Sequence, residues 1–301
     1  MRLRHIEVFH AVYTTGSITA AARLLSVSQP AVSKVLAHAE QQLGFALFYR
    51  HKGKLVPTQE AEQLIYHVTG AYENISELRR VSENLRTADA GWVRIATIPA
   101  LEMELLPRAV ASYLKQHPDT HLEIDSLQLR QIISELREHR INIGLAFNPP
   151  VTPGIQADVL ATGEMVALVH ARSDPGCRKD LSLEELEGFP LISLSTKNPL
   201  GNLLANHFEA CETIFQPSVT VETYQLAAAL VVQGVGIAIV DEFTARSFAH
   251  PELVICSLRP ALRFDVAMLR LENEPLSLIS ERFVKYLQAE IDSLMRTDIT
   301  A

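Results

Sequence analysis

The stretch SITAAARLLSVSQPAVSKVLAHAEQQLG, residues 17–44, consists of two amphipathic segments joined by a very short turn. Ser17 stands where it can cap the first helix, and Ser28 stands where it can cap the second. Pro30 falls in the first turn of the second helix, where a missing backbone N–H costs little. Two helices joined so tightly meet at a steep angle, so the second can enter a major groove while the first braces it. The stretch therefore predicts a helix-turn-helix that binds DNA.

The periodicity of the two helices separates a buried face from a polar one. The residues expected to face the core are Ile18, Ala21, Ala22, Leu24 and Leu25 in the first helix and Val32, Val35, Leu36, Ala39 and Leu43 in the second. Glutamine and serine side chains can hydrogen-bond base edges, and a lysine can reach a base or a phosphate. The residues predicted to contact DNA here are Ser28, Gln29, Pro30, Ala31, Ser33 and Lys34. The alternative is a plain helical hairpin with a solvated polar face.

The segment FALFYRHKGKLVPT, residues 45–58, favours DNA binding over the plain hairpin. It holds a short apolar strand, a basic turn around Gly53 and a second strand, which together predict a wing. Arg50, Lys52 and Lys54 are placed to contact the phosphate backbone, and such contacts fix the register on the duplex without reading its sequence.

The distribution of charge supports a polyanionic partner for the N-terminal segment alone. The chain has 301 residues and a net charge of −8, but residues 1–58 contain seven arginines and lysines against two glutamates. This gives +5 for the segment and leaves −13 for the rest, so a basic head precedes an acidic body. A hydrophobic content of 48% and a charged content of 21% are typical of soluble globular proteins.

Three features of the sequence predict a cytoplasmic protein without membrane association. The N-terminus lacks the apolar segment of a signal peptide, and no apolar run is long enough to span a bilayer. The three isolated cysteines, Cys177, Cys211 and Cys256, form no CxxC pair, which fits a reducing compartment.

Residues 58–88 predict one long helix, capped by Thr58, with apolar residues at heptad spacing. The apolar seam consists of Ala61, Leu64, Val68, Ala71, Ile75, Leu78 and Leu85, with Ile65, Tyr72 and Val81 alongside. A seam this narrow is best buried against a copy of itself, so we expect a homodimer and, from its two-fold axis, a palindromic DNA site. The alternative is packing on the body of the same chain.

From Gly91 onward, strand-like and helix-like segments alternate, which indicates parallel α/β architecture. The predicted strands are residues 92–98, 121–127, 141–147, 165–171, 189–195, 218–223 and 236–242. The predicted helices are residues 99–117, interrupted near Pro107, and residues 130–140, 201–211 and 224–234. Because the alternation of strands and helices occurs twice along the chain, we expect two lobes.

Four motifs follow one another at the spacing of a known family. They are LRHIEVFHAV at 3–12, GSITAAARLLSVSQPAVSKVLAHAEQQLG at 16–44, the set Leu47, Phe48 and Arg50, and PTQEA at 57–61. The chain resembles the LysR-type transcriptional regulators, closely over its N-terminal 65 residues and in the order of its elements over the rest. Its N-terminal motifs are most similar to those of the lysine- and opine-responsive branch. Two positions depart from the family pattern: Lys34 stands where many members have arginine, and Glu62 where the usual motif has glycine.

The resemblance implies a fold of three parts. A winged helix-turn-helix DNA-binding domain at 1–58 precedes a dimerising linker helix at 59–88 and an α/β effector-binding domain at 91–301. The last domain is similar to periplasmic binding proteins, with lobe I at 91–161 and 268–301, lobe II at 162–267, and hinge crossings near residues 162 and 266. The resemblance also implies a homotetramer on double-stranded promoter DNA and RNA polymerase as a further partner.

Parallel sheets bind ligands at the carboxyl ends of their strands, where helix N-termini also point. The residues placed there in the resembled fold are Thr97, Pro99, Ala100, Phe147, Asn148, Ser195, Thr196, Glu222, Thr223 and Asp241. Hydroxyl groups and helix N-termini suit a carboxylate, and Glu222 or Asp241 can hold an ammonium, so we hypothesise an amino-acid-like small-molecule effector. The alternative for each serine or threonine is a cap or turn residue.

Catalytic motifs are absent from the sequence, so we expect no enzyme, no metal site and no cofactor. No G-x-S-x-G, H-E-x-x-H or P-loop sequence occurs, and the eleven histidines lack metal-ligand spacing. GVGIAI at 234–239 mimics a dinucleotide fingerprint, but it follows a predicted helix and enters a strand, the reverse of the required order. The remaining alternative is a two-lobed solute-binding or sensor protein without sequence-specific DNA function, which explains the lobes but not the basic wing.

Overall fold

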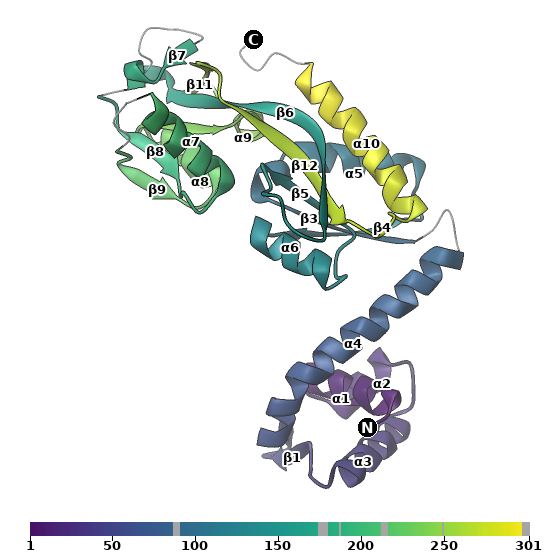
Figure 1. Cartoon of the computed structure of the whole chain (residues 1–301). Helices are drawn as coiled ribbons and strands as arrows, with labels where there is room; N and C mark the ends of the chain where they lie inside the picture. The colour runs from purple at the N-terminus through teal and green to yellow at the C-terminus, as the bar shows by residue number, and fades with distance from the viewer. Residues whose placement is uncertain (87–90, 174–179, 187, 212–215, 249, 297–301) are drawn as a thin grey trace. The chain divides into compact units, whose positions relative to one another are not determined.

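The computed structural model describes residues 1–86, 91–173, 180–186, 188–211, 216–248 and 250–296. The chain divides into two compact units, Met1–Leu85 and Arg86–Ala301 (Figure 1). Each unit has a hydrophobic core of its own. In the described part of the chain, no helix combines the length and the apolarity needed to cross a membrane.

The N-terminal unit contains the predicted helix-turn-helix and wing. Its elements are α1 (Leu3–Thr15), α2 (Ile18–Leu24), α3 (Gln29–Leu43), β1 (Phe48–His51), β2 (Lys54–Pro57) and α4 (Gln59–Arg86). Apolar side chains from the four helices and from Leu47 form one core, in which Phe9, Val12, Val32 and Leu47 are completely buried. This core sets the relative positions of the helices and of the hairpin that follows them.

The start of the helix-turn-helix follows the prediction at Ser17 but not at two other residues. Ser17 caps α2, because its hydroxyl accepts a hydrogen bond from the backbone N–H of Ala20. Ser28 occupies the N-cap position of α3, but its side chain makes no capping hydrogen bond and is exposed. Leu24, which we predicted to be buried, is 63% exposed, since α2 ends there and Leu25 is the residue that packs on the core.

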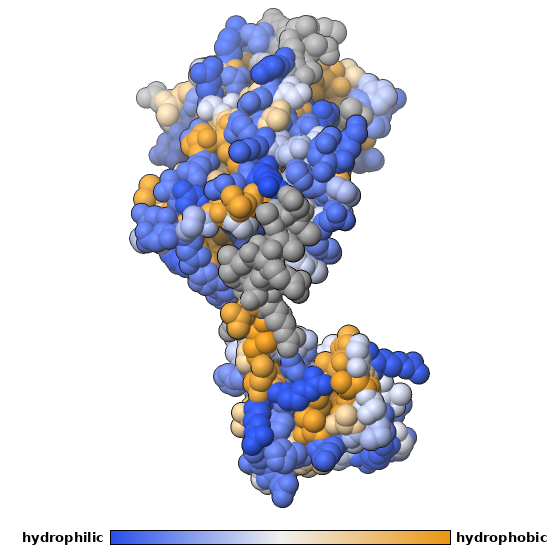
Figure 2. All heavy atoms as spheres, turned by 90° about the vertical axis from the view of Figure 1, so that its right-hand side faces the viewer, coloured by the Kyte–Doolittle hydropathy of each residue, from blue (hydrophilic) through white to orange (hydrophobic). Residues whose placement is uncertain are grey.

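The long helix α4 is partly buried in its own unit. The Thr58 hydroxyl accepts a hydrogen bond from the backbone N–H of Ala61, so the predicted cap is confirmed. Ala61 and Val68 belong to the core, which means that the first half of the apolar seam packs on its own chain. Further along, Leu78 is 69% exposed, and hydrophobic residues gather on the surface of this helix (Figure 2). The side chains of Val81 and Leu85, and residues 87–88, lie outside the described part of the structure.

The second unit contains ten described strands, eight of which follow the order β4-β3-β5-β12-β6-β10-β8-β9. They are β3 (Trp92–Thr97), β4 (His121–Ser126), β5 (Ile143–Phe147), β6 (Ile155–His170), β7 (Asp180–Ser182), β8 (Leu191–Leu194), β9 (Val219–Val221), β10 (Ile237–Asp241), β11 (Leu253–Arg259) and β12 (Arg263–Leu271). Off this path, β11 pairs with β6 and β7. The α-helices are α5 (Leu105–Gln116), α6 (Leu129–Arg137), α7 (Pro199–Ala210), α8 (Tyr224–Val232), α9 (Glu242–Ser247) and α10 (Leu278–Met295), and the short 3₁₀ helices are η1 (Pro99–Leu101), η2 (Ala171–Ser173) and η3 (Glu184–Leu186).

Strand β6 belongs to two sheets and so joins two lobes. Its first half, up to Glu164, pairs with β12 beside β5, β3 and β4, and these strands form the first lobe. Its second half, from Met165, pairs with β10 and β11 beside β8, β9 and β7, which form the second lobe. The predicted crossings near residues 162 and 266 lie in β6 and β12, where the Thr162 hydroxyl donates a hydrogen bond of 3.2 Å to the Asp265 carboxylate.

Several elements of this unit differ from the prediction. The strand predicted at 165–171 is only the second half of β6. The first half lacks a continuous apolar run, and nearly all of its residues are exposed or half-buried. The helix predicted at 99–117 is η1 followed by α5, which begins at Leu105 and so holds Pro107 in its first turn, where a proline is tolerated. We did not predict β7, β11 or α9 from the sequence.

Candidate nucleic-acid interface and ligand pocket

The outer surface of α3 displays all six residues that we predicted for its contact with DNA. Burial of Val32, Leu36 and Ala39 turns the opposite side of the helix outward. Ser28, Gln29, Pro30, Ala31 and Lys34 are exposed, and Ser33 is half-buried. The Gln29 amide donates a hydrogen bond of 3.0 Å to the Ser33 hydroxyl, so the two proposed base-reading side chains lie next to each other.

The wing is a tight hairpin with a basic tip. Arg50 pairs with Leu55, and His51 pairs with Lys54, which leaves a two-residue loop. The loop residues Lys52 and Gly53 both have positive φ, +50° and +80°. Two positive φ values are characteristic of the turn that matches the twist of an antiparallel hairpin. Arg50, Lys52 and Lys54 are all exposed, as a contact with phosphates requires.

Glu40 connects α3 to the wing, and the sequence analysis did not identify it. Its carboxylate accepts hydrogen bonds from the backbone N–H groups of Leu47, at 2.8 Å, and Phe48, at 3.3 Å. A hydrogen bond from a backbone N–H to a carboxylate is stronger than one to a neutral acceptor. The available signal was the charge pattern, because Glu40 is one of only two acidic residues among residues 1–58.

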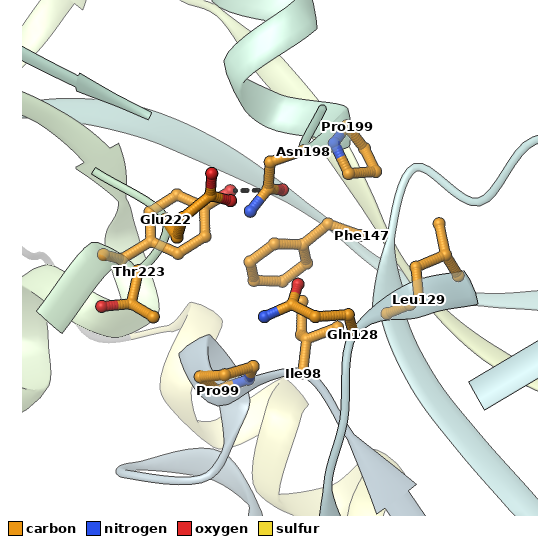
Figure 3. A pocket seen from close by; sticks show the side chains of 11 residues that line it. Ile98, Pro99, Gln128, Leu129, Phe147, Asn198, Pro199, Glu222 and Thr223 are labelled. Carbon is orange, nitrogen blue, oxygen red and sulfur yellow. Dashed lines mark hydrogen bonds between the residues drawn. The ribbon is translucent and has the colours of Figure 1, made fainter. Parts of the chain in front are cut away.

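A pocket in the second unit lies where residues from both lobes meet (Figure 3). It is lined by Ile98, Pro99, Gln128, Leu129, Ala146, Phe147, Asn198, Pro199, Glu222, Thr223 and Tyr224. The Phe147 ring stands in the middle of the pocket, between Asn198 and Gln128. This inner pocket has a volume of about 20 Å³, which is room for a single water molecule.

An open groove continues from the inner pocket and has a volume of about 820 Å³, enough for a small organic ligand. It is lined by Gln128, Leu129, Arg130, Ile133, Asn148, Pro150, Thr196, Lys197, Asn198, Pro199, Asn202, Leu203, Asn206 and Glu222. Five residues line both the inner pocket and the groove: Gln128, Leu129, Asn198, Pro199 and Glu222. The two spaces are therefore parts of one candidate site.

Three helices begin at this site. Gln128, Asn198 and Thr223 are the N-cap residues of α6, α7 and α8, and all three line the inner pocket. The side chains of Asn198 and Thr223 make no capping hydrogen bond. The first N–H groups of a helix have no partner within the helix and lie at the positive end of its dipole, so the site favours an anionic group.

A close backbone approach places the start of α7. A Cβ atom at Gly201 would lie 2.3 Å from the carbonyl oxygen of Ser195, so only glycine permits this helix to pack so near the loop that follows β8. Pro199 occupies the first position of α7, where its missing N–H and its fixed φ suit a helix start.

The structure brings six of the ten predicted effector residues to the site. Pro99, Phe147, Glu222 and Thr223 line the inner pocket, and Asn148, Thr196 and Glu222 line the groove. Thr97 and Ala100 are completely buried and do not line either space. Ser195 accepts a hydrogen bond from the backbone N–H of Lys197, which is the turn-residue alternative for that serine.

Asp241 also lies outside the pocket lining. It is completely buried and caps α9, with one carboxylate oxygen accepting from the Thr244 N–H at 2.9 Å and the other from the Thr244 hydroxyl at 2.7 Å. With both oxygens engaged in this cap, it is not placed to hold a ligand's ammonium. Burial raises the pKa of Asp241 to about 7, against the opposing effect of the Thr244 hydrogen bonds. Burial, and then the nearby Asp241 charge, raise the pKa of Tyr224 well above its ordinary value.

Sequence reasoning missed part of the pocket lining. The residues concerned include Gln128, Arg130, Asn198, Asn202 and Asn206, whereas Lys197 ends the stretch 193–197 that we expected at the site. Gln128 and Arg130 follow the end of β4, a strand end that we did not include among the candidate positions. Asn198 followed by Pro199 was a readable helix start, since asparagine favours the N-cap and proline the next position.

A hydrogen bond crosses between the lobes beside the pocket. The Gln225 side-chain amide of α8 donates to the carbonyl oxygen of Pro99 in η1. The Tyr224 hydroxyl, which lines the inner pocket, donates to the Asn198 side-chain oxygen at 3.3 Å. These bonds hold the walls of the inner pocket together in the observed arrangement.

Known protein families and relatives match the chain over nearly its whole length. Residues 3–62 match the model described as "Bacterial regulatory helix-turn-helix protein, lysR family", and residues 86–292 match the "LysR substrate binding domain". The chain is 42% identical over 287 residues to the HTH-type transcriptional regulator DgcR of Pseudoalteromonas sp, covering 95% of this chain and 99% of the relative.

Further relatives and a solved structure are similar over comparable lengths. The transcriptional activator protein LysR of Escherichia coli K12 is 32% identical over 98% of this chain and 95% of its own. The octopine catabolism/uptake operon regulatory protein OccR of Rhizobium meliloti is 30% identical over 98% of both chains. The crystal structure of full-length CbnR with its target DNA superposes with a TM-score of 0.71 at 20% identity, over 96% of this chain and 100% of CbnR.

Proposed function

Since the chain belongs to the LysR family of bacterial transcriptional regulators, we propose that α3 and the wing bind promoter DNA and that a ligand in the pocket modulates this binding. The family consists of DNA-binding regulators with an effector-binding domain, not of enzymes. The helix-turn-helix match at residues 3–62 favours this function over the alternative of a solute-binding protein without a DNA site.

In this proposal, Gln29, Ser33 and Lys34 read base edges in the major groove, and the exposed wing residues contact phosphates. The support is the exposure of Gln29 and Lys34 on α3, the hydrogen bond between Gln29 and the half-buried Ser33, and the tight hairpin that carries Arg50 and Lys52. Base contacts supply specificity, whereas phosphate contacts supply most of the affinity and its dependence on salt.

The protein acts as a homodimer joined through the second half of α4, beyond the part of the seam that its own core covers. The exposed Leu78 and the hydrophobic surface of this helix support this arrangement (Figure 2). Two such dimers form a homotetramer, which contacts RNA polymerase at the promoter. The protein works in the cytoplasm, where the promoter DNA is.

The effector is an amino acid or a derivative of one. The observation that carries this proposal is the convergence of three helix N-termini with the Glu222 carboxylate, because the former suit a carboxylate and the latter suits an ammonium. The relative named for octopine catabolism is consistent with such a ligand class. Binding shifts the arrangement of the heads on DNA only to the extent that the ligand has different affinities for the two states.

A gel shift of the purified protein tests this function. The protein should retard its own upstream DNA in preference to a scrambled duplex, and one pool of amino acids or opines should change the mobility or affinity of the complex. If no pool has an effect and calorimetry detects no binding of any amino acid, the amino-acid assignment is wrong. If upstream DNA and the scrambled duplex are bound equally, genome-wide DNA capture will show whether a distant operator exists.

A further inference from the structure

The groove contains charged residues that lack a partner of opposite charge within the described chain. Arg130 on α6 and Lys197 after β8 both line the groove, and neither forms an ion pair with any described residue. Several arginines elsewhere in the same unit form ion pairs: Arg94 with Glu123, Arg259 with Asp180, Arg263 with Glu164 and Arg270 with Asp158. The groove thus concentrates cationic groups that are available to a ligand.

The groove carries more positive charge than a simple amino acid, with one carboxylate and one ammonium, would neutralise. Glu222 is its one described acidic residue, against Arg130 and Lys197. The starts of α6 and α7, helices of 9 and 12 residues, add the positive ends of two dipoles at the same surface. One carboxylate and one ammonium would leave the cations without a counterion, whereas a ligand with two anionic groups would balance them.

The two cations come from different lobes. Arg130 follows β4 and belongs to the first lobe, and Lys197 follows β8 and belongs to the second. A group that contacts both side chains therefore links the lobes. Such a ligand binds more tightly to the lobe arrangement that brings the two cations together than to one that separates them. A regulatory ligand needs this difference in affinity between two arrangements.

We propose that the effector carries a second anionic group, held between Arg130 and Lys197, in addition to an amino-acid head beside Glu222 and the start of α7. This inference rests on the proposed amino-acid effector and narrows it to acidic amino acids and their conjugates. The ligand lies in the groove, because the inner pocket has room for only a water molecule.

Isothermal titration calorimetry of the full-length protein tests the proposal. The probes are aspartate and glutamate in both enantiomeric forms and O-phosphoserine, compared with asparagine, glutamine, lysine and arginine. An anionic probe should bind at least about tenfold more tightly than its neutral counterpart, the effect of one hydrogen-bonded charge pair. A preference for O-phosphoserine over glutamate identifies the second group as a phosphate, and the reverse preference identifies a carboxylate.

Variants separate a contact from a structural role. Arg130→Gln and Lys197→Gln should each weaken the best anionic probe by about tenfold and leave the affinity for glutamine unchanged within about twofold. Arg137→Gln is the matched control, since Arg137 lies on the same helix, outside the groove lining, and donates to the Pro153 carbonyl. An equal loss for glutamine in the Arg130 variant would contradict the proposed contact.

Other outcomes distinguish this inference from the proposed function. If glutamine, lysine or arginine binds as tightly as the acidic probes, the second anionic group is wrong and the amino-acid effector stands. If no probe binds while the protein still prefers its upstream DNA, the amino-acid effector and this inference are both wrong, and the regulator function stands.

Discussion

The Glu40 carboxylate accepts a hydrogen bond of 2.8 Å from the backbone N–H of Leu47 and thereby ties the end of α3 to the start of the wing. A second bond, from the Phe48 N–H at 3.3 Å, reinforces the connection. The wing carries Arg50 and Lys52, so this one carboxylate positions the proposed phosphate contacts relative to the proposed recognition helix.

Removing this carboxylate should loosen the wing. We expect Glu40→Ala to lower the stability of the N-terminal unit by about 1–3 kcal/mol, because two backbone donors lose their acceptor, and to weaken binding to specific and random DNA alike. Thermal unfolding by circular dichroism and fluorescence anisotropy with labelled duplexes measure the two effects. Glu60→Ala, at an exposed glutamate of α4, is the control. Unchanged stability and affinity would show that the connection is dispensable.

The proposed base-reading residues should affect specificity more than overall affinity. Gln29→Ala and Ser33→Ala should each reduce the preference for the operator over random DNA by about 1–3 kcal/mol, because they remove contacts to base edges. Competition gel shifts measure this ratio, with Gln42→Ala, exposed near the end of α3, as the control. Equal losses on operator and random DNA would contradict base reading by that residue.

The wing should determine the dependence of binding on salt. Lys52→Ala should weaken binding to all sequences alike and reduce the slope of log K against log salt by about 1, because one phosphate contact is lost. Affinities measured by anisotropy across a series of salt concentrations give the slope. A slope equal to that of the unchanged protein would exclude a phosphate contact for Lys52.

The exposed end of the α4 seam should control dimerisation. Leu78→Glu should shift the protein from dimer to monomer in sedimentation velocity at micromolar concentration, since it introduces a charge into an apolar interface. Tyr66→Glu serves as the control, because Tyr66 is 81% exposed on the same helix but lies off the seam. If both variants remain dimers, the interface lies elsewhere.

Stability of the second unit should fall as Asp241 ionises. Its folded-state pKa of about 7 lies above the ordinary value of 3.8, because burying the ionised carboxylate costs more free energy than burying the neutral carboxyl. The stabilisation that comes from keeping Asp241 protonated is therefore fully present below about pH 4. As pH rises from about 4 to about 7 it is lost, and the free energy of unfolding falls by at most about 4 kcal/mol.

Asp241→Asn should remove this component of the pH dependence, because an amide retains the shape of the cap without ionising. Urea unfolding followed by the fluorescence of Trp92, the one tryptophan of the chain, reports on this unit alone. The difference in free energy of unfolding between the variant and the unchanged protein should move in favour of the variant as pH rises from about 4 to about 7. A constant difference across this range would contradict the raised pKa.

Local patterns account for the parts of the structure that the sequence predicted well. The helix-turn-helix, the wing and the caps at Ser17 and Thr58 depend on residues within a few positions of one another, so periodicity and capping chemistry reveal them. The errors arose where local patterns are ambiguous. The first half of β6 is half-buried and lacks an apolar run, and Leu24 has helical spacing but lies at a helix end.

By itself, the sequence determined the class of the protein: a basic winged helix-turn-helix head on an acidic α/β body. Only the tertiary structure decided which strand ends form the pocket. Thr97 and Asp241 stand at strand ends like Phe147, yet they are buried away from the site, whereas Arg130 and Lys197 line it. The reason is that strand order and helix packing are set by contacts between segments far apart in the chain, which no local pattern records.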